Sequence, residues 1–219
     1  MFKYQLFIIL SFSFILSSCE KKLKKTLCNQ GNLLNIDSVY HIKKYELKFA
    51  DYIEEIELYT TKKKDTFINS NKVIYKDSVC RKLSFYYDLK IYTSETPNLY
   101  NGEIILHSYN YDFRSTKNRR KTIYFTYNNL CKDSLYTKVI ISKGNLPIKF
   151  KFENCFNNTL QGSLVEIIEI GTLQNKIRQK IDKLAVDNYI VTDNLLFDSY
   201  KIDKRFSLKD YIKEKKEQK

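Results

Sequence analysis

The feature that most constrains this chain is a two-residue alternation of apolar and polar side chains through its middle. Between residues 83 and 91, every second residue is apolar: Leu83, Phe85, Tyr87, Leu89 and Ile91. Successive side chains of a strand point to opposite faces of a sheet, so this period predicts a strand with one buried face. Sheets with one polar face are typically antiparallel, and we expect antiparallel pairing here.

The same alternation recurs in residues 45–49, 123–127 and 148–152. About seven or eight strands between residues 45 and 155 indicate an antiparallel sandwich or a curved meander. Gly144–Pro147 separates two strand-like runs, 135–143 and 148–155, and predicts a hairpin turn between them.

After residue 155 the pattern changes. Leu173, Ile177, Ile181 and Leu184 are spaced by three and four residues, which predicts an amphipathic helix. Ser207 followed by Asp210 is typical of a capping box and predicts a short helix at the C-terminal end. The fold class expected is therefore mainly β with C-terminal helices (α+β). We expect one β-rich domain over residues 36–219, with a helical segment from about residue 160.

The N-terminus has the features of an export signal. Residues 6–16 contain only Leu, Phe, Ile and Ser, a run too short to span a bilayer but suited to a signal peptide. The next residues, Leu16-Ser17-Ser18-Cys19, closely resemble the lipobox of bacterial lipoproteins. The resemblance covers only the first 19 residues. It implies removal of residues 1–18, acylation of Cys19 (palmitate in that family) and a tether over residues 19–35. The alternative is an ordinary secretory signal with a cysteine there by chance.

This resemblance places the mature chain in a bacterial envelope, held to a membrane by its lipids. We expect the outer membrane rather than the inner one, with the facing side left open. Export disfavours nucleic acid as a partner despite a net charge of +13, and a Bacteroidota-like, AT-rich composition accounts for part of that charge. The densest basic stretch, Arg114–Lys121, is interpreted either as a solvated loop or as a contact for lipopolysaccharide phosphates or an acidic partner.

Three tripeptides resemble the O-glycosylation acceptor of exported Bacteroidota proteins. They are Asp37-Ser38-Val39, Asp77-Ser78-Val79 and Asp133-Ser134-Leu135. The resemblance implies glycans on Ser38, Ser78 and Ser134.

With Cys19 acylated, four cysteines remain: Cys28, Cys80, Cys131 and Cys155. An even number in an exported chain predicts two disulfides, with free thiols as the alternative. Three pairings exist. We favour Cys131 with Cys155, because they flank the predicted hairpin, and Cys28 with Cys80. The chain has no CxxC spacing and only two His, so we predict no metal and no cofactor.

No residue pattern predicts a catalytic group. His107 lies in the strand-like run 104–113, on the same face as Ile105, Tyr109 and Tyr111, and is interpreted as a structural histidine. The one acidic cluster is interpreted as a solvated face, with Ca²⁺ binding or paired acid–base work as alternatives. It comprises Asp51, Glu54, Glu55 and Glu57.

Tyrosine is the remaining candidate for recognition, because it offers a large contact area and a hydroxyl group. Tyr86, Tyr109, Tyr111 and Tyr124 lie on neighbouring strand-like runs and are a candidate patch for a protein or a sugar. The simpler interpretation is that tyrosine favours strands. We therefore expect a membrane-anchored, non-catalytic binding module for an envelope protein or glycan, with an inhibitor or immunity protein as a sub-case. The alternative is an envelope hydrolase without a recognisable motif.

Overall fold

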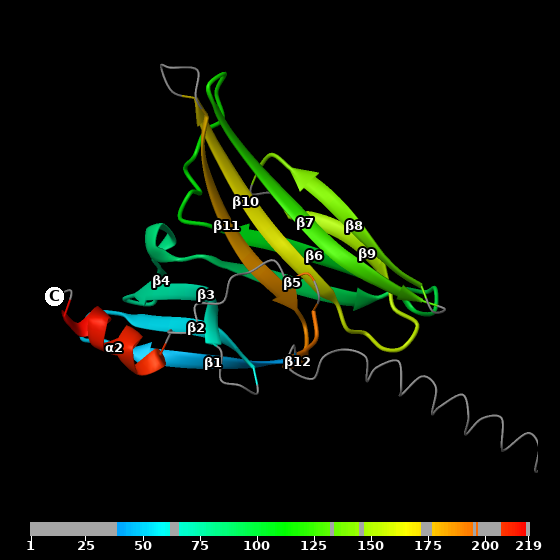
Figure 1. The fold of residues 1–219 in the computed structure, drawn as a ribbon, viewed down its shortest axis with the longest axis horizontal. Helices are drawn as coiled ribbons and strands as arrows, with labels where there is room; N and C mark the ends of the chain where they lie inside the picture. Colours follow the sequence, from blue (N-terminus) through cyan, green and yellow to red (C-terminus); the bar gives the residue numbers. More distant parts are fainter. Residues whose placement is uncertain are drawn as a thin grey trace, which may run out of the picture. The chain divides into compact units, whose positions relative to one another are not determined.

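The described residues form twelve strands in a computed structural model of the chain (Figure 1). The structure describes residues 39–61, 66–131, 134–144, 147–171, 177–194, 196 and 207–217. All strand pairs are antiparallel, and a short 3-10 helix spans Arg81–Leu83. The expected class, mainly β and antiparallel with helix at the C-terminal end, is confirmed.

The strands belong to three sheets, named A, B and C here. Sheet A has the order β12-β1-β2-β3-β4 and consists of β12 (Val191–Thr192), β1 (Tyr40–Lys48), β2 (Ile53–Thr61), β3 (Thr66–Tyr75) and β4 (Ser78–Val79). Sheet B has the order β5-β6-β9 and consists of β5 (Tyr86–Thr93), β6 (Leu99–His107) and β9 (Ile148–Glu153). Sheet C has the order β11-β10-β7-β8 and consists of β11 (Ile177–Asp187), β10 (Gln161–Gly171), β7 (Arg119–Cys131) and β8 (Ser134–Ser142).

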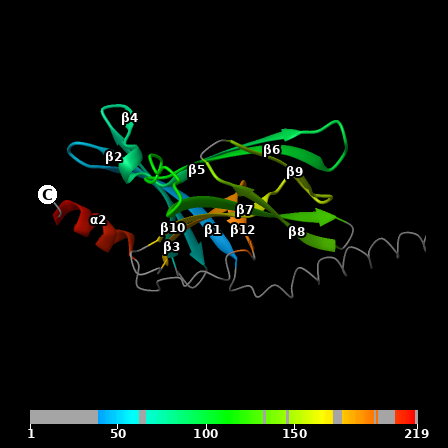
Figure 2. The ribbon, with the colours of Figure 1, turned by 90° about the horizontal axis from the view of Figure 1, so that it is seen from above.

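Sheets B and C face each other and enclose the main apolar core, as in a sandwich (Figure 2). Phe125 of β7 and Phe150 of β9 meet across this core with ring centroids 4.8 Å apart. The ring of Phe150 lies against Gly102 of β6, where a Cβ atom would overlap it. A side chain at that position would therefore force the Phe150 ring to move.

Sheet A packs on the opposite face of one end of sheet C. Tyr40 and Tyr59 form a second buried cluster with Ala185 of β11. Asn69 of β3 extends this contact, since its amide donates to the Ala185 carbonyl at 3.0 Å and accepts from the Ala185 N–H at 2.6 Å. The side chain thus replaces a neighbouring strand along this part of the β11 edge.

The predicted amphipathic helix is wrong, because Gln161–Gly171 and Ile177–Asp187 are the strands β10 and β11. Leu184, Ala185 and Val186 are consecutive and all buried, because the end of β11 lies between the main core and sheet A. Burial on both faces removes the alternation that marks a strand.

The helix at the C-terminal end is confirmed as α2 (Leu208–Glu217). The Ser207 hydroxyl accepts the Asp210 N–H at 3.4 Å, as the capping box predicts. In the described part of the chain, no helix is both long and apolar enough to cross a membrane.

The predicted hairpin at Gly144–Pro147 is also wrong. β8 pairs with β7 in sheet C, whereas β9 pairs with β6 in sheet B. The chain therefore crosses between the two layers of the sandwich at this point. Turn residues mark where a strand ends but not which strand it pairs with.

Candidate functional site

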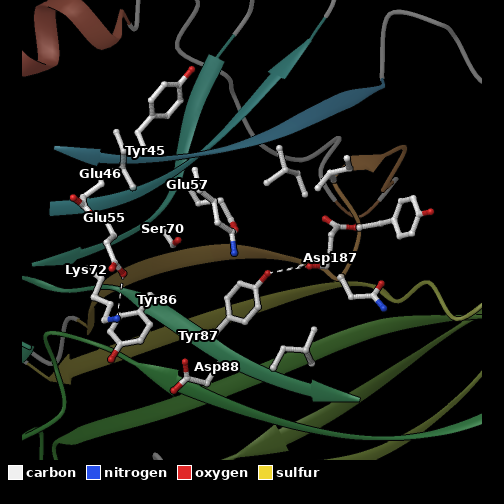
Figure 3. Close-up of a pocket in the computed structure, with 17 residues that line it drawn as sticks. Tyr45, Glu46, Glu55, Glu57, Ser70, Lys72, Tyr86, Tyr87, Asp88 and Asp187 are labelled. Atoms are coloured by element: carbon white, nitrogen blue, oxygen red, sulfur yellow. Dashed lines mark hydrogen bonds and ion pairs between the residues drawn. The ribbon is translucent and has the colours of Figure 1, made fainter. Parts of the chain in front are cut away.

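A hollow of about 730 Å³ lies between sheet A, β5 and residues 187–190; we call it the groove (Figure 3). Its lining combines polar and aromatic side chains with four aliphatic ones. The carboxylates are Glu46, Glu55, Glu57, Asp88 and Asp187, the lysines are Lys44 and Lys72, and the tyrosines are Tyr45, Tyr86, Tyr87 and Tyr189. Five acids against two lysines make the groove acidic, although the chain as a whole is strongly basic.

The start of β5 is tied to β3, which places Tyr86 on the wall of the groove. Asn71 and Phe85 exchange two backbone hydrogen bonds, of 3.0 and 2.8 Å. Next to this bridge, the Lys72 ammonium lies 3.1 Å from a Glu55 oxygen and 5.7 Å from the centroid of the Tyr86 ring. The ring therefore carries a cation over one face, at a distance typical of a cation–π contact.

Asp187 anchors the other end of the groove. Its carboxylate accepts hydrogen bonds from Tyr59 at 3.1 Å, from Thr192 at 2.7 Å and from Asn194 at 3.2 Å. Burial raises the pKa of Asp187 to about 6, against the opposing effect of these donors. Burial likewise raises the pKa of Tyr87, whose hydroxyl lies 3.3–3.4 Å from the Asp187 backbone. Because structural donors occupy both oxygens, Asp187 holds the groove together rather than acting on a ligand.

A second hollow of about 300 Å³ shares Tyr86 with the groove. The Tyr86 ring stacks on His107 with centroids 4.4 Å apart, and His107 Nε2 lies 2.8 Å from an Asp88 oxygen. Two serines also line this hollow. The Ser84 hydroxyl donates to the Cys80 carbonyl at 2.8 Å, and the Ser108 hydroxyl donates to Glu166 at 2.6 Å. In the described structure neither serine is hydrogen-bonded to His107, so no nucleophile–base pair is formed.

The structure brings together only part of the predicted tyrosine patch. Tyr86 and Tyr111 both line the second hollow. Tyr109 packs on Phe85, and the Lys180 ammonium lies 4.0 Å from its ring centroid. Tyr124 lies on the outer face of sheet C, in register with residues of β8 and β10. The predicted strand 104–113 ends at His107, and the turn that follows separates Tyr109 and Tyr111 from the strand face.

The Cys131–Cys155 disulfide is present, with Cα atoms 4.9 Å apart. Its structural basis differs from the predicted hairpin. The Cys155 N–H donates to the Leu130 carbonyl at 2.8 Å, so the segment after β9 lies beside the end of β7. The bridge therefore joins the two layers of the sandwich. A Glu153 oxygen lies within 4.8 Å of both sulfurs, but paired sulfurs are not metal ligands.

Some of the remaining predicted sites lie within the described residues and others lie outside them. Cys19, Cys28 and Ser38 lie outside the described residues. Cys80 is a free thiol in the described structure. Ser78 and Ser134 are both exposed, each at the first residue of a strand. The glycans and the Cys28–Cys80 disulfide stay predictions.

The two charged clusters are less solvated than expected. Glu54 is fully buried, whereas Glu55 beside it is exposed. In the basic stretch, Lys121 is 4% exposed and its ammonium lies 2.7 Å from Glu166, while Arg119 and Arg120 are exposed. The solvated interpretation is therefore wrong for Glu54 and Lys121.

The groove itself was not predicted from the sequence, although the acidic cluster contains two of its residues, Glu55 and Glu57, and a second signal pointed toward it. The alternation in residues 83–91 places Tyr86 and Asp88 on the polar face of β5. Nothing local shows that β1, β2 and β3 lie opposite that strand. No family model matches this chain, and neither a curated protein nor a solved structure matches it.

Proposed function

We propose that this chain is a membrane-anchored envelope lipoprotein whose β domain is a non-catalytic binding module. The observation that carries the proposal is the acidic, tyrosine-lined groove in a chain of net charge +13. We infer that the groove binds a basic segment of a partner protein. An inhibitor or immunity lipoprotein, which occupies the surface of a toxin or lytic enzyme, is one form of this function.

The chemistry of the lining supports a cationic ligand. Carboxylates accept short, charge-assisted hydrogen bonds from Lys and Arg, and tyrosine faces attract the same cations. Lys72 already shows this mode, since it contacts both Glu55 and the Tyr86 ring. Neutral sugars also stack on tyrosine and their hydroxyl groups can donate to carboxylates, but they gain nothing from the net negative charge of the lining. The glycan alternative is therefore the weaker one.

Binding is favoured over hydrolysis because carboxylates of the groove are paired with lysines, which does not leave them as a free general acid or base. Glu55 pairs with Lys72, and Glu57 lies 3.6 Å from Lys44. In each pair one partner is well exposed, Lys44 in one and Glu55 in the other, and ion pairs open to solvent contribute little to stability, so they can be exchanged for contacts with a partner. A hydrolase would instead rely on the Asp88–His107 pair as acid or base.

The test is affinity capture of the full-length, lipidated chain from its own envelope, with crosslinking and mass spectrometry. Asp88 is 58% exposed in its side chain, so Asp88→Lys reverses a groove charge without disturbing the core. We expect about tenfold less partner captured, given the typical strength of a charged contact. Glu95→Lys is the matched control, because Glu95 is exposed and outside the groove. Equal capture by both variants would contradict the groove as the binding site.

The anchor is tested separately. Cys19→Ser should move the chain from the membrane fraction to the soluble fraction, since stable anchoring requires the acyl chains. Retention of the variant in the membrane fraction would contradict lipidation without affecting the groove. Turnover of an envelope polymer that is lost in His107→Gln would instead favour the hydrolase.

A further inference from the structure

The edges of the three sheets differ in how they are protected. An edge strand exposes unpaired backbone groups, and proteins shield such edges with short strands, charges or covering side chains. β4 and β12 are two residues long. β9 carries Lys149 and Lys151, and β5 is bridged to β3 through Phe85. β11 is covered at one end by Asn69 and carries several charges along the rest.

β8 lacks these forms of protection. It pairs with β7 over all nine residues with no register shift, and it contains no proline. Its first six residues are exposed, and Lys138 is its only charged residue. The side chains of Leu135, Val139 and Ile141 share the outer face of sheet C and are 50%, 55% and 61% exposed. Among the described residues β8 is the last strand of its sheet, so this long edge carries one charge, has no strand beside it and is apolar on one face.

We propose that β8 is a self-association surface, on which β8 of a second copy pairs antiparallel about a two-fold axis at Val139. Two-fold contacts between identical surfaces are the commonest way in which soluble chains assemble. When two β8 strands pair in this way, the apolar side chains of both lie on the same face. The apolar face of sheet C then continues into the second copy.

The distribution of charge favours β8 as the contact surface and disfavours a pairing centred on Lys138. Two copies of net charge +13 repel each other over most of their surfaces, and β8 is a long edge with a single charge. A pairing centred on Lys138 would set two ammonium groups directly opposite each other, which is destabilising. A pairing centred on Val139 keeps the same side-chain faces aligned and sets Lys138 opposite Ile140 instead.

The size of the contact sets the expected strength. A nine-residue strand is about 30 Å long, so the pairing buries less than the roughly 1,600 Å² of a standard interface. The dimer should therefore depend on concentration. It does not involve the groove and is independent of the proposed function.

Oxidative crosslinking of full-length chains in membranes tests the register. Val139→Cys places two thiols directly opposite each other, and we expect it to form covalent dimers. Ile141→Cys is the matched control, because Ile141 would face Thr137 and not itself. Unsubstituted chains report any background from the native thiols. Equal crosslinking at both positions, or none at Val139→Cys, would overturn the proposal.

Co-purification of two differently tagged copies tests the association itself. Val139→Lys should reduce recovery of the second tag at least tenfold, because two ammonium groups would meet at the axis. Ile177→Lys is the control, since Ile177 is 65% exposed on the same face but at the opposite edge of the sheet. Unchanged recovery with Val139→Lys overturns the proposal. So does capture of a strand from another protein at β8 in place of the second copy.

Discussion

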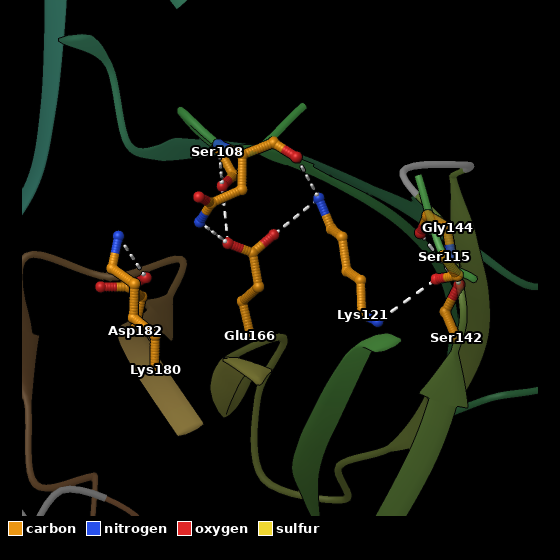
Figure 4. A network of polar contacts seen from close by, with 9 residues as sticks. Ser108, Ser115, Lys121, Ser142, Gly144, Glu166, Lys180 and Asp182 are labelled. Atoms are coloured by element: carbon orange, nitrogen blue, oxygen red, sulfur yellow. Dashed lines mark hydrogen bonds and ion pairs between the residues drawn. The ribbon is translucent and has the colours of Figure 1, made fainter. Parts of the chain in front are cut away.

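The sandwich of sheets B and C and the five-stranded sheet A each bury one carboxylate completely, but they satisfy it in different ways. Glu166 of β10 has an ammonium at 2.7 Å, from Lys121, and accepts hydrogen bonds from Ser108 and Asn110 at 2.6 and 2.7 Å (Figure 4). The Lys121 ammonium also donates to the Asn110 carbonyl at 3.1 Å. The charges are balanced within the sandwich.

Glu54 of β2 depends instead on α2. One of its oxygens accepts the Tyr211 hydroxyl at 2.8 Å and the Asn71 amide of β3 at 3.4 Å, and it lies 3.8 Å from the Lys215 ammonium. The other oxygen has no hydrogen-bond partner among the described residues. The comparison teaches that the sandwich forms its polar network from β7, β10 and the turn that follows β6. Sheet A requires the last helix of the chain to cover its charge.

The largest effect is expected from breaking the sandwich network. Lys121→Met leaves Glu166 buried without a counter-ion, and we expect the free energy of unfolding to fall by about 3–5 kcal/mol. Urea unfolding measures this loss. Lys90→Met removes an exposed lysine and should change the free energy of unfolding by less than about 0.5 kcal/mol. A similar loss of stability in both variants would show that the buried Lys121–Glu166 pair contributes no more than an exposed lysine.

A second change tests the apolar half of the same region. Gly102→Ala forces a Cβ atom into the ring of Phe150, and we expect a loss of about 1–3 kcal/mol from overpacking. Gly144→Ala is the matched control, because nothing lies within 4 Å of its added Cβ. Equal thermal stability of the two variants would contradict the tight contact at Gly102.

A smaller effect is expected where Glu54 meets α2. Tyr211→Phe removes a hydroxyl donor from a buried carboxylate, at a cost of about 1–2 kcal/mol. Limited proteolysis should also cut α2 faster, because the helix loses its contact with β2. Tyr92→Phe, at an exposed tyrosine, should leave both measurements unchanged. If α2 of the Tyr211→Phe variant stays protected, the helix is held by other contacts.

The smallest effect on stability is expected at Asp187, which connects the two regions. Asp187 is the last residue of β11, and its carboxylate accepts the Tyr59 hydroxyl of sheet A. Its folded-state pKa of about 6 lies above the ordinary value of 3.8. Between these values the folded chain holds a proton that the unfolded chain has lost, so this contribution to stability grows as the pH falls from 6 to 4. Between pH 5 and pH 4 we expect the free energy of unfolding of wild type to rise by about 1 kcal/mol relative to that of Asp187→Asn. If wild type instead lost stability relative to Asp187→Asn on acidification, a raised pKa of Asp187 in the folded chain would be contradicted.

Sequence patterns predicted elements well wherever a strand has one buried face. Phe125 in β7 and Phe150 in β9 lie on the faces that alternation assigned to them. The prediction failed at Leu184–Val186, because that segment is covered on both sides. It also failed at Gly144–Pro147, because a turn signal does not name a pairing partner.

The candidate site shows the same division. The Cys131–Cys155 pair was chosen correctly, but from a hairpin that does not exist. Tyr86 was singled out by residue type and Glu55 as part of the acidic cluster, but nothing in the sequence placed them together or pointed to Lys72 between them. Such contacts join residues far apart in the chain, and side-chain spacing carries no information about them.

By itself, the sequence determined the β class, the strand faces, the capped helix at the C-terminal end and the resemblance to a lipoprotein signal. These features depend on residues within a few positions of one another, where backbone geometry sets the period. Only the tertiary structure decided the strand order, the burial of Glu54 and Lys121, the groove and the open edge of β8. Each of these depends on which distant segments pack together, because burial and charge neutralisation are properties of the assembled layers.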